Sequence, residues 1–243
     1  MKTYHYFLIA FLVICIDQTS KLLVHHFMYL HEEITVLGNE QYGFKLYYLL
    51  NPGMAFGLKW DNEFGKLALT GFRIIAMFGI SYYLISMAKQ KAHKGFLICM
   101  ALILGGAVGN VIDSTFYGVF LNNAPADSPT PWFHGQVIDM LFFKLFDFTW
   151  PEWMPLVGGE YFLFFGPVFN IADSSIFIGV VIILFRQKVF FKETAEQTTA
   201  TQETIQQETA IENAEQLNAD GNHVSNPHQS ENNEEEKQEP KAD

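Results

Sequence analysis

Two aspartates stand in apolar surroundings, where an ionised side chain is energetically unfavourable. Asp173 lies in FNIADSSIFIGVVIILF (Phe169–Phe185), an apolar run long enough to enter a bilayer. Asp139 lies in GQVIDMLFF, just before an aromatic-rich stretch. A carboxylate inside a membrane costs several kcal/mol unless it is paired, protonated or used in a reaction. Both aspartates are therefore candidates for proton-transfer chemistry, and the alternative for Asp139 is a solvated residue of an outer loop.

Polar residues also occur in pairs at helical spacing within three apolar segments. The pairs are Asp17 with Lys21, Asn110 with Asp113, and Asn170 with Asp173. Residues three or four apart share a helix face, and an acid four residues before a lysine has the favourable order for an ion pair. Small residues surround the last two pairs, in GGAVGN and IADSS, and such residues let helices approach closely. We expect the pairs to meet inside a helix bundle, either as contacts between helices or as parts of a site.

Four apolar stretches are close to the roughly 20 residues needed to cross a membrane. They cover residues 6–24, 67–87, 95–112 and 165–185. The first stretch could be a cleaved signal peptide, but the polar residues from Asp17 to Lys21 follow it without a small-residue cleavage pattern. We therefore predict a retained helix and an all-α membrane protein with four transmembrane helices.

Basic residues at the ends of these stretches predict the orientation. They lie before the first stretch, between the second and third, and after the fourth: Lys2, Lys89, Lys91, Lys94, Arg186, Lys188 and Lys192. The connection from Asp113 to Phe164 holds a single basic residue, Lys144. Because basic loops are retained in the cytoplasm, both termini should be cytoplasmic and the two long connections external. The polar pairs then fall at one depth, in the outer half of the membrane.

The external connections are predicted to contain structure of their own. Ile34–Leu37 and Phe44–Leu50 are β-prone runs separated by glycine and asparagine, which favours a small hairpin or sheet. The aromatic-rich LFFKLFDFTWPEW suits a segment that lies at the level of the lipid headgroups. A proline-rich stretch, NNAPADSPTPW, lies between Asp113 and Asp139 and is expected to be irregular.

The C-terminal part of the chain differs from the rest. Residues 193–243 contain 13 acidic and two basic residues, so this segment carries the whole formal charge of −11. It is rich in Glu, Gln, Asn and Thr and cannot bury enough apolar surface to offset chain entropy. We predict a membrane domain over residues 1–192 and a disordered, acidic cytoplasmic tail over residues 193–243. The acidity argues against nucleic-acid binding.

An ordered series of motifs resembles lipoprotein signal peptidase, also called signal peptidase II, across about residues 6–186. DQTSK (17–21) resembles the family's Asp-Gln-x-x-Lys, and NPGMAFG (51–57) resembles its Asn-x-Gly-x-Ala-Phe loop. GGAVGNVID (105–113) is similar to the third-span motif, VIDM (137–140) to Val-x-Asp-Phe, and FNIADS (169–174) to Phe-Asn-x-Ala-Asp-Ser. Two features depart from the family. Ser114 stands where the family usually has arginine, and the interval from Asp113 to Asp139 is longer than usual.

The resemblance implies a membrane aspartyl endopeptidase that removes signal peptides from diacylglyceryl-modified prolipoproteins, cutting before the lipidated cysteine. It implies Asp139 and Asp173 as the catalytic residues. The supporting residues would be Asp17, Lys21, Asn51, Gly53, Asn110, Asp113 and Asn170. No metal or other cofactor is expected, and the partners would be lipidated prolipoproteins and membrane lipids. The location would be the bacterial inner membrane, with the site near its outer face.

Two carboxylates suit this reaction because close carboxylates share one proton. One can then act as a general base toward water while the other polarises the carbonyl and helps to protonate the amine. The main competing function is an ion- or proton-coupled transporter, which also keeps acids within its spans. A non-catalytic membrane scaffold and a triad of Ser114, His134 and Asp139 are less favoured interpretations. A Gly-x-Gly-Asp intramembrane protease is disfavoured because the chain lacks that motif.

Overall fold

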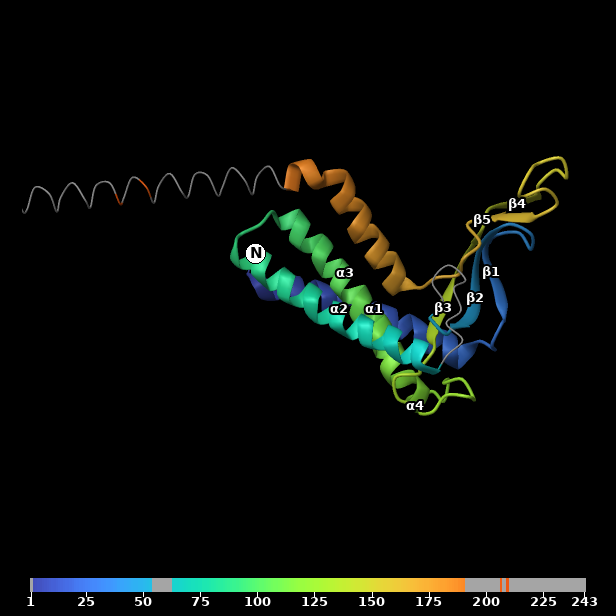
Figure 1. Cartoon of the computed structure of the whole chain (residues 1–243), viewed down its shortest axis with the longest axis horizontal. Helices are drawn as coiled ribbons and strands as arrows, with labels where there is room; N and C mark the ends of the chain where they lie inside the picture. The colour runs from blue at the N-terminus through green and yellow to red at the C-terminus, as the bar shows by residue number, and fades with distance from the viewer. Residues whose placement is uncertain (1, 54–62, 191–205, 207–208, 210–243) are drawn as a thin grey trace, which may run out of the picture. The chain divides into compact units, whose positions relative to one another are not determined.

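The structure of this protein is a computed structural model that describes residues 2–53, 63–190, 206 and 209. In this part of the chain, three helices are long and apolar enough to cross a membrane. They are α1 (Thr3–Phe27), α2 (Glu63–Lys89) and α3 (Lys94–Ile112), which continues into the π-helix η1 (Asp113–Tyr117) and α4 (Gly118–Phe120). The helices contain the first three predicted spans, and Figure 1 shows them running side by side.

Two sequence predictions concern residues that the structure does not describe. The acidic tail, residues 193–243, lies outside the described part except for residues 206 and 209. Residues 54–57 of the NPGMAFG motif also lie outside it, whereas Asn51 and Gly53 are described.

Helix α1 carries its charges on the buried face and its large apolar side chains on the exposed face. The side chains of Leu8, Phe11, Leu12 and Ile16 are each more than half exposed. The buried positions recur at spacings of three, four or seven residues: Tyr6, Ala10, Asp17, Lys21 and Val24. Such an arrangement is the reverse of a soluble amphipathic helix. It is typical of a helix that faces lipid outward and polar groups inward.

Glycines of α3 allow two other helices to approach its backbone. A Cβ atom on Gly106 would lie 2.3 Å from the carbonyl oxygen of Ala172, in the last helix. A Cβ atom on Gly109 would lie 2.5 Å from Oδ2 of Asp17, in α1. Any side chain larger than hydrogen would therefore push these helices apart. The small residues of GGAVGN thus place the polar side chains of three helices within reach of one another.

The last helix begins later than the sequence predicted. Residues 171–190 are helical, and they form the orange helix in Figure 1. The predicted start at residue 165 is wrong, because Tyr161–Phe164 form strand β5 and Phe169 makes a β-bridge to Leu141. Pro167 disfavours helix in the residue before it. The backbone hydrogen bonds of Phe169 are made with β3 rather than within a helix.

Two antiparallel sheets occupy the two long connections that were predicted to be external. β1 (Glu33–Gly38), β2 (Gly43–Asn51) and β3 (Val137–Lys144) form a sheet in that order. β4 (Phe146–Thr149) pairs with β5. The predicted hairpin is therefore confirmed as β1 and β2. The expectation that Asp139 lies in a loop is wrong, because Asp139 is part of β3 and pairs with Leu49. The aromatic-rich segment likewise forms strands, so the fold is helical with two small sheets.

A short backbone link joins the sheet to the start of the last helix. The Leu141 N–H donates to the Phe169 carbonyl over 2.7 Å, and the Phe169 N–H donates back to Leu141 over 3.1 Å. Asp139 precedes Leu141 by two residues, and Asn170 directly follows Phe169. The link therefore brings a strand residue and a helix-capping residue to the same place, although they are 31 residues apart in the chain.

Candidate active site

A buried lysine joins two carboxylates at the interface between α1 and α3. Lys21 Nζ lies 2.8 Å from Asp17 Oδ2 and 2.7 Å from Asp113 Oδ2, and all three side chains are fully buried. The same ammonium group donates to Asn110 Oδ1 over 3.1 Å. The predicted i,i+4 ion pair therefore forms, and it has a second acid as a partner. A buried charge is tolerable only when its partners satisfy it in this way.

Gln18 completes this polar cluster, although it was not among the residues predicted for the site. Its Nε2 group donates to Asp113 Oδ1 over 2.9 Å, to Asp17 Oδ2 over 3.1 Å and to the Gly109 carbonyl over 3.2 Å. Its Oε1 atom accepts a hydrogen bond of 2.8 Å from the Tyr117 hydroxyl. The position of Gln18 in the DQTSK motif was the signal that could have identified it.

Asp17 also anchors the last helix. Its Oδ1 atom accepts a hydrogen bond of 2.8 Å from the backbone N–H of Ala172, in the first turn of that helix. Backbone N–H groups in the first turn have no partner within the helix, and the helix dipole favours a negative charge there. Asp17 therefore helps to position the first turn of the last helix against α1.

Asn170 and Asp173 form a reciprocal N-cap of the last helix. Asn170 Oδ1 accepts from the Asp173 N–H over 2.9 Å, and Asp173 Oδ2 lies 3.4 Å from the Asn170 N–H. This is the arrangement of a capping box, in which the capping residue and the third helical residue satisfy each other's backbone donors. The i,i+3 spacing in the sequence therefore marks a helix start rather than a face within the helix.

Asn110 connects the α1–α3 cluster to this helix start. It accepts the hydrogen bond from Lys21, and its Nδ2 group donates to Asp173 Oδ1 over 2.8 Å. The Asp173 carboxylate thus receives one side-chain donor from α3 and one backbone donor from its own cap. Both interactions favour a defined orientation of Asp173.

Asp139 receives amide donors from two directions. Asn170 Nδ2 donates to its Oδ1 atom over 2.7 Å, and Asn51 Nδ2 donates to its Oδ2 atom over 3.0 Å. Its side chain is 1% exposed. Burial, followed by the negative charge of Asp173, raises the pKa of Asp139 to about 7, against the opposing effects of the two amides and of Lys21. Asp139 therefore changes its protonation state near neutral pH.

The turn after β2 orients Asn51. Asn51 pairs with Val137 in the sheet, so it lies diagonally across from Asp139 on the neighbouring strand. Its Oδ1 atom accepts a hydrogen bond of 2.8 Å from the Gly53 N–H. Gly53 has a φ angle of +99°, which is strained for residues with a side chain. The glycine therefore allows the turn that directs the Asn51 amide toward Asp139.

An arginine from α2 lies beside these carboxylates. Arg73 Nη1 donates to Ser114 Oγ over 2.6 Å, and Ser114 Oγ donates to the Asn110 carbonyl over 2.8 Å. Ser114 stands where the resemblance implies arginine, and here the guanidinium comes from another helix. Arg73 was not predicted from the sequence as a site residue. The signal was an ionisable residue within the predicted span 67–87, which by itself suggests a functional role.

The serine-protease interpretation is not supported by the geometry. Ser114 donates to a backbone carbonyl and accepts from Arg73. His134 Nδ1 contacts the Trp132 carbonyl at 2.9 Å, and its Nε2 atom has no hydrogen-bond partner among the described residues. The hydrogen bonds to Asp139 come from Asn51 and Asn170. In the part of the chain that the structure describes, no hydrogen bond joins Ser114, His134 and Asp139 as a triad.

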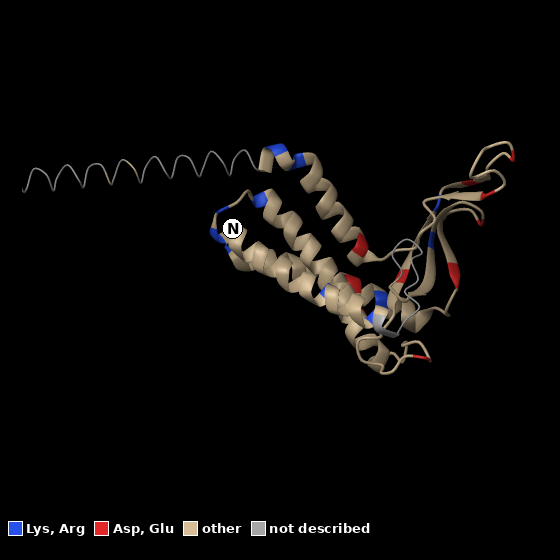
Figure 2. Ribbon diagram, viewed as in Figure 1, with Lys and Arg blue, Asp and Glu red and all other residues tan. Residues whose placement is uncertain are grey.

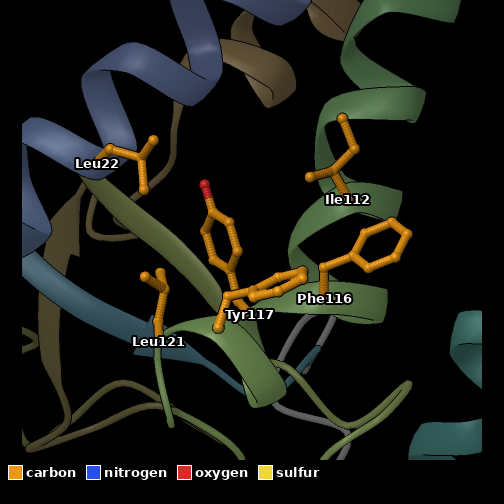
Figure 3. A pocket seen from close by; sticks show the side chains of 6 residues that line it. Leu22, Ile112, Phe116, Tyr117 and Leu121 are labelled. Carbon is orange, nitrogen blue, oxygen red and sulfur yellow. The ribbon is translucent and has the colours of Figure 1, made fainter.

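An apolar pocket of about 400 Å³ opens next to the polar cluster (Figure 3). Its lining comes from α1, α3, η1, α4 and the residue that follows α4, and consists of Leu22, Ile112, Phe116, Tyr117, Phe120 and Leu121. Tyr117 belongs to both regions, because its ring lines the pocket and its hydroxyl donates to Gln18. The pocket can accept an apolar group within a few residues of the buried charges.

The structure thus brings together every described residue that was predicted for the site. Both candidate catalytic carboxylates contact Asn170, and the others join them through Asn110, Lys21 and the turn at Gly53. The arrangement holds two acids from different elements, buried Asp139 and half-buried Asp173, in one hydrogen-bonded cluster. The charge of Asp173 contributes to the raised pKa of Asp139, and carboxyl groups that interact in this way are candidates for proton sharing and water activation.

Known proteins resemble this chain over most of its length. A family model described as signal peptidase (SPase) II matches residues 9–189. The lipoprotein signal peptidase of Amoebophilus asiaticus is 42% identical over 199 residues, which cover 81% of this chain and 83% of the relative. The lipoprotein signal peptidase of Porphyromonas gingivalis is 39% identical over 183 residues, which cover 71% of this chain and 78% of the relative.

A solved structure also resembles the fold. It is a bacterial membrane enzyme that is 24% identical in sequence, with a TM-score of 0.50. The match covers 76% of this chain and 88% of the other. At this identity, the likeness concerns the arrangement of helices and sheets alone.

Proposed function

Because this chain belongs to the signal peptidase II family and cleaves signal peptides from prolipoproteins, we propose that Asp139 and Asp173 are its catalytic pair. The observation that carries the proposal is their common partner. Asn170 donates from its side-chain amide to Asp139 and from its backbone N–H toward Asp173. The family match does not support a transporter.

The two carboxylates have different surroundings, which suits different roles. Asp173 lies at the start of a helix, where the dipole and the backbone donors favour a negative charge. Asp139 is buried in the sheet, and its pKa is raised to about 7. We assign the shared proton of the resting enzyme to Asp139 and the ionised, water-activating role to Asp173. The sequence alone left this assignment open.

Hydrolysis follows from this assignment. Asp173 takes a proton from a water molecule, whose oxygen attacks the scissile carbonyl carbon, while protonated Asp139 donates a hydrogen bond to the carbonyl oxygen. When the tetrahedral intermediate collapses, the C–N bond breaks and the leaving amine takes a proton from the pair. One proton remains shared, so the enzyme is ready for another cycle. Because the site is buried, these electrostatic interactions are stronger than they would be in water.

Supporting roles follow from the contacts of the remaining residues. Asn51 and Asn170 orient Asp139, and Asn110 orients Asp173. Asp17, Lys21 and Asp113 lock α1, α3 and the last helix in the relative positions that the pair needs. Gly53 sets the turn that Asn51 requires and presents main-chain groups to an extended peptide.

We infer that the substrate is a diacylglyceryl-modified prolipoprotein that is cut before its lipidated cysteine. Helix α1 exposes apolar side chains close to the polar cluster, among them Ile16 and Leu23, which suits a signal peptide that is still in the membrane. The apolar pocket beside Tyr117 has the size and lining for part of an acyl chain. The exposed aromatic residues of the β4–β5 hairpin suit contact with lipid headgroups, and the most exposed large apolar side chains there are Trp153 and Leu156.

The charge distribution supports an orientation with four membrane helices and both termini in the cytoplasm. In Figure 2 the coloured residues at the end of the bundle that holds the N-terminus are blue, whereas both red and blue residues lie toward the sheets. Basic ends are retained in the cytoplasm. In this orientation, the site lies near the outer face of a bacterial inner membrane, and residues 1–192 form the membrane domain. The acidic segment over residues 193–243 then extends into the cytoplasm.

The experiment that tests this proposal compares three variants in a cleavage assay with a lipidated precursor. Asp139→Asn and Asp173→Asn should each abolish cleavage while membrane insertion is unchanged. Asp147→Asn is the matched control, because Asp147 lies on β4, in the separate β4–β5 sheet, and makes no hydrogen bond to Asn170 among the described residues. If either of the first two variants cleaves as fast as the wild-type protein, that residue is not part of the catalytic pair.

A further inference from the structure

Arg73 is a cation that the apolar helix α2 directs into the bundle. Its Nη1 group donates to Ser114 Oγ over 2.6 Å, and Ser114 is 1% exposed. Ser114 in turn donates to the carbonyl of Asn110, whose side chain donates to Asp173. The guanidinium is therefore one side chain removed from the residue that orients Asp173.

Arg73 also lies against the turn that orients the other acid. Its Nη2 atom is 3.8 Å from the position that a Cβ atom on Gly53 would occupy. Gly53 binds Asn51, and Asn51 donates to Asp139. The guanidinium thus lies beside both sets of contacts, those that orient Asp173 through Asn110 and those that orient Asp139 through Asn51.

The guanidinium interacts with the carboxylates through space without bonding to them. Asp173, Asp113 and Asp139 all contribute to its electrostatic environment. Within the described residues, however, no ion pair joins Arg73 to a carboxylate, and its hydrogen bond goes to a neutral hydroxyl. Ser114 therefore holds the positive charge near the acids at a distance from each of them.

The cations near the catalytic pair are Lys21, Lys66 and Arg73. Lys66 Nζ is buried with no hydrogen-bond partner among the described residues, whereas Arg73 is bonded into the network through Ser114. Lys21 is already in contact with Asp17 and Asp113 at 2.8 and 2.7 Å. A pair of acids that shares one proton carries one negative charge. Arg73 balances that charge, and an arginine stays protonated across the whole pH range of the reaction.

We propose that Arg73 is a positioning residue that stabilises the singly protonated state of Asp139 and Asp173, with Ser114 preventing an ion pair to either acid. This inference rests on the proposed catalytic pair. An ion pair would fix one acid in its ionised form and take it out of proton sharing. A missing cation would instead favour the form in which both acids are protonated. The hydrogen bond from Arg73 to Ser114 keeps the cation close to the acids without forming an ion pair to either of them.

Additional charged or titratable groups face this region from each neighbouring element. They are Asp17 and Lys21 from α1, Lys66 from α2, Asp113 and Tyr117 from η1, and His134 from the segment that packs between α2 and η1. These groups remain in every variant described below. A change between variants therefore reports on Arg73 and Ser114 rather than on this background.

The test is the pH profile of kcat/KM for cleavage of a lipidated precursor by the full-length protein in detergent micelles. A pair that is active with one proton gives a bell-shaped profile with two limbs. A nearby positive charge lowers the pKa of an acid, so Arg73→Gln should move both limbs to higher pH by about one unit. Arg73→Lys keeps the charge and should restore the limbs to within a few tenths of a unit.

Ser114→Ala is a second variant, for which we expect the pH profile to shift in the opposite direction. Without the hydroxyl, the guanidinium is free to approach Asp139 or Asp173, so both limbs should move to lower pH and the maximum should fall. Two matched controls keep the charge near the pair unchanged. Thr70 and Lys89 both belong to α2, the helix of Arg73. Thr70→Val removes a hydrogen bond of 3.0 Å from Thr70 to the Phe133 carbonyl, and Lys89→Gln removes the charge at the last residue of α2.

The outcomes separate this inference from the proposed function. Lower activity with unmoved limbs in both Arg73→Gln and Ser114→Ala overturns the role of Arg73 and leaves the catalytic pair intact. Limbs that move in the controls as much as in these variants also overturn it. Full cleavage by Asp139→Asn or Asp173→Asn counts against the pair itself, whatever the Arg73 variants do.

Discussion

Asn170 donates a hydrogen bond of 2.7 Å to Asp139, and both side chains are almost completely buried. Asn170 is also the N-cap of the helix that carries Asp173. One residue therefore performs a structural task, the start of a helix, and orients an acid on a separate strand. This dual role makes the geometry of the proposed catalytic pair depend on how the last helix begins.

Asn170→Ala should consequently affect both stability and rate. Loss of an N-cap side chain costs about 1 kcal/mol of stability. Loss of the Asn170 hydrogen bond to the Asp139 carboxyl, which holds the shared proton in the proposed resting enzyme, is worth about 0.5–1.5 kcal/mol, which corresponds to a roughly 2- to 10-fold fall in kcat/KM. Thermal unfolding in detergent and the lipidated-precursor assay measure the two effects separately.

Ser175→Ala is the matched control for that variant. Ser175 lies in the same helix, is buried, and donates to the Ala172 carbonyl over 2.8 Å. The Ser175→Ala variant should be somewhat less stable than the wild-type protein and should keep the wild-type kcat/KM. If Asn170→Ala loses only as much activity as this control, then Asn170 acts on the helix and not on the acids.

The pH dependence of stability should report the raised pKa of Asp139. The unfolded pKa of an aspartate is about 3.9, and the folded value is about 7. Between these values the folded protein holds a proton that the unfolded chain has released. Its stabilising contribution is therefore full below about pH 4 and is lost as the pH rises toward 7.

Asp139→Asn should remove this dependence. The wild-type protein is expected to lose on the order of 2–4 kcal/mol between pH 4 and pH 8 from this group. The variant should therefore show a flatter curve and a higher melting temperature than the wild-type protein at pH 8. Asp147→Asn provides the comparison. An equally steep curve for Asp139→Asn and the wild-type protein would show that the transition belongs to another group.

Much of this site was predictable because its residues carry their own local signals. An acid and a lysine four residues apart predicted the pair of Asp17 and Lys21, and the β-prone runs predicted β1 and β2. Asn170 and Asp173 were identified, but their spacing was interpreted as a shared helix face. Asn followed three residues later by an acid is also a capping pattern, and the structure has the cap.

Features that could not be predicted depended on contacts between distant segments. The apolar run at residues 165–185 looks continuous, but Phe169 pairs with Leu141 across the sheet, and this delays the helix to residue 171. The same contact makes Asp139 a strand residue. The charge of Arg73 within an apolar span was a signal for a functional role, but nothing near it in the sequence identified its partner. Its partner, Ser114, lies 41 residues away.

Lys21→Met should test the cluster that holds the helices together. The change leaves Asp17 and Asp113 buried without their cation, and breaking such a group costs about 3–5 kcal/mol. We expect a much lower yield of folded protein. In the double variant Lys21→Met with Asp113→Asn, one of the two uncompensated charges is gone, so part of the yield should return. An unchanged melting temperature in Lys21→Met would contradict the role of this cluster in stability.

The apolar pocket beside Tyr117 should determine how well the enzyme binds the lipid of its substrate. Leu22→Trp places a larger ring at the pocket wall and should raise KM for a lipidated precursor several-fold, while kcat changes little, because the catalytic pair is not touched. Leu23→Trp is the matched control, since Leu23 is the next residue of α1, is 51% exposed and is not part of the lining. Precursors with short and long acyl chains make the measurement sharper. The KM difference between the two should shrink in Leu22→Trp if the pocket holds an acyl chain, and it should stay as in the wild-type protein if the chain binds elsewhere.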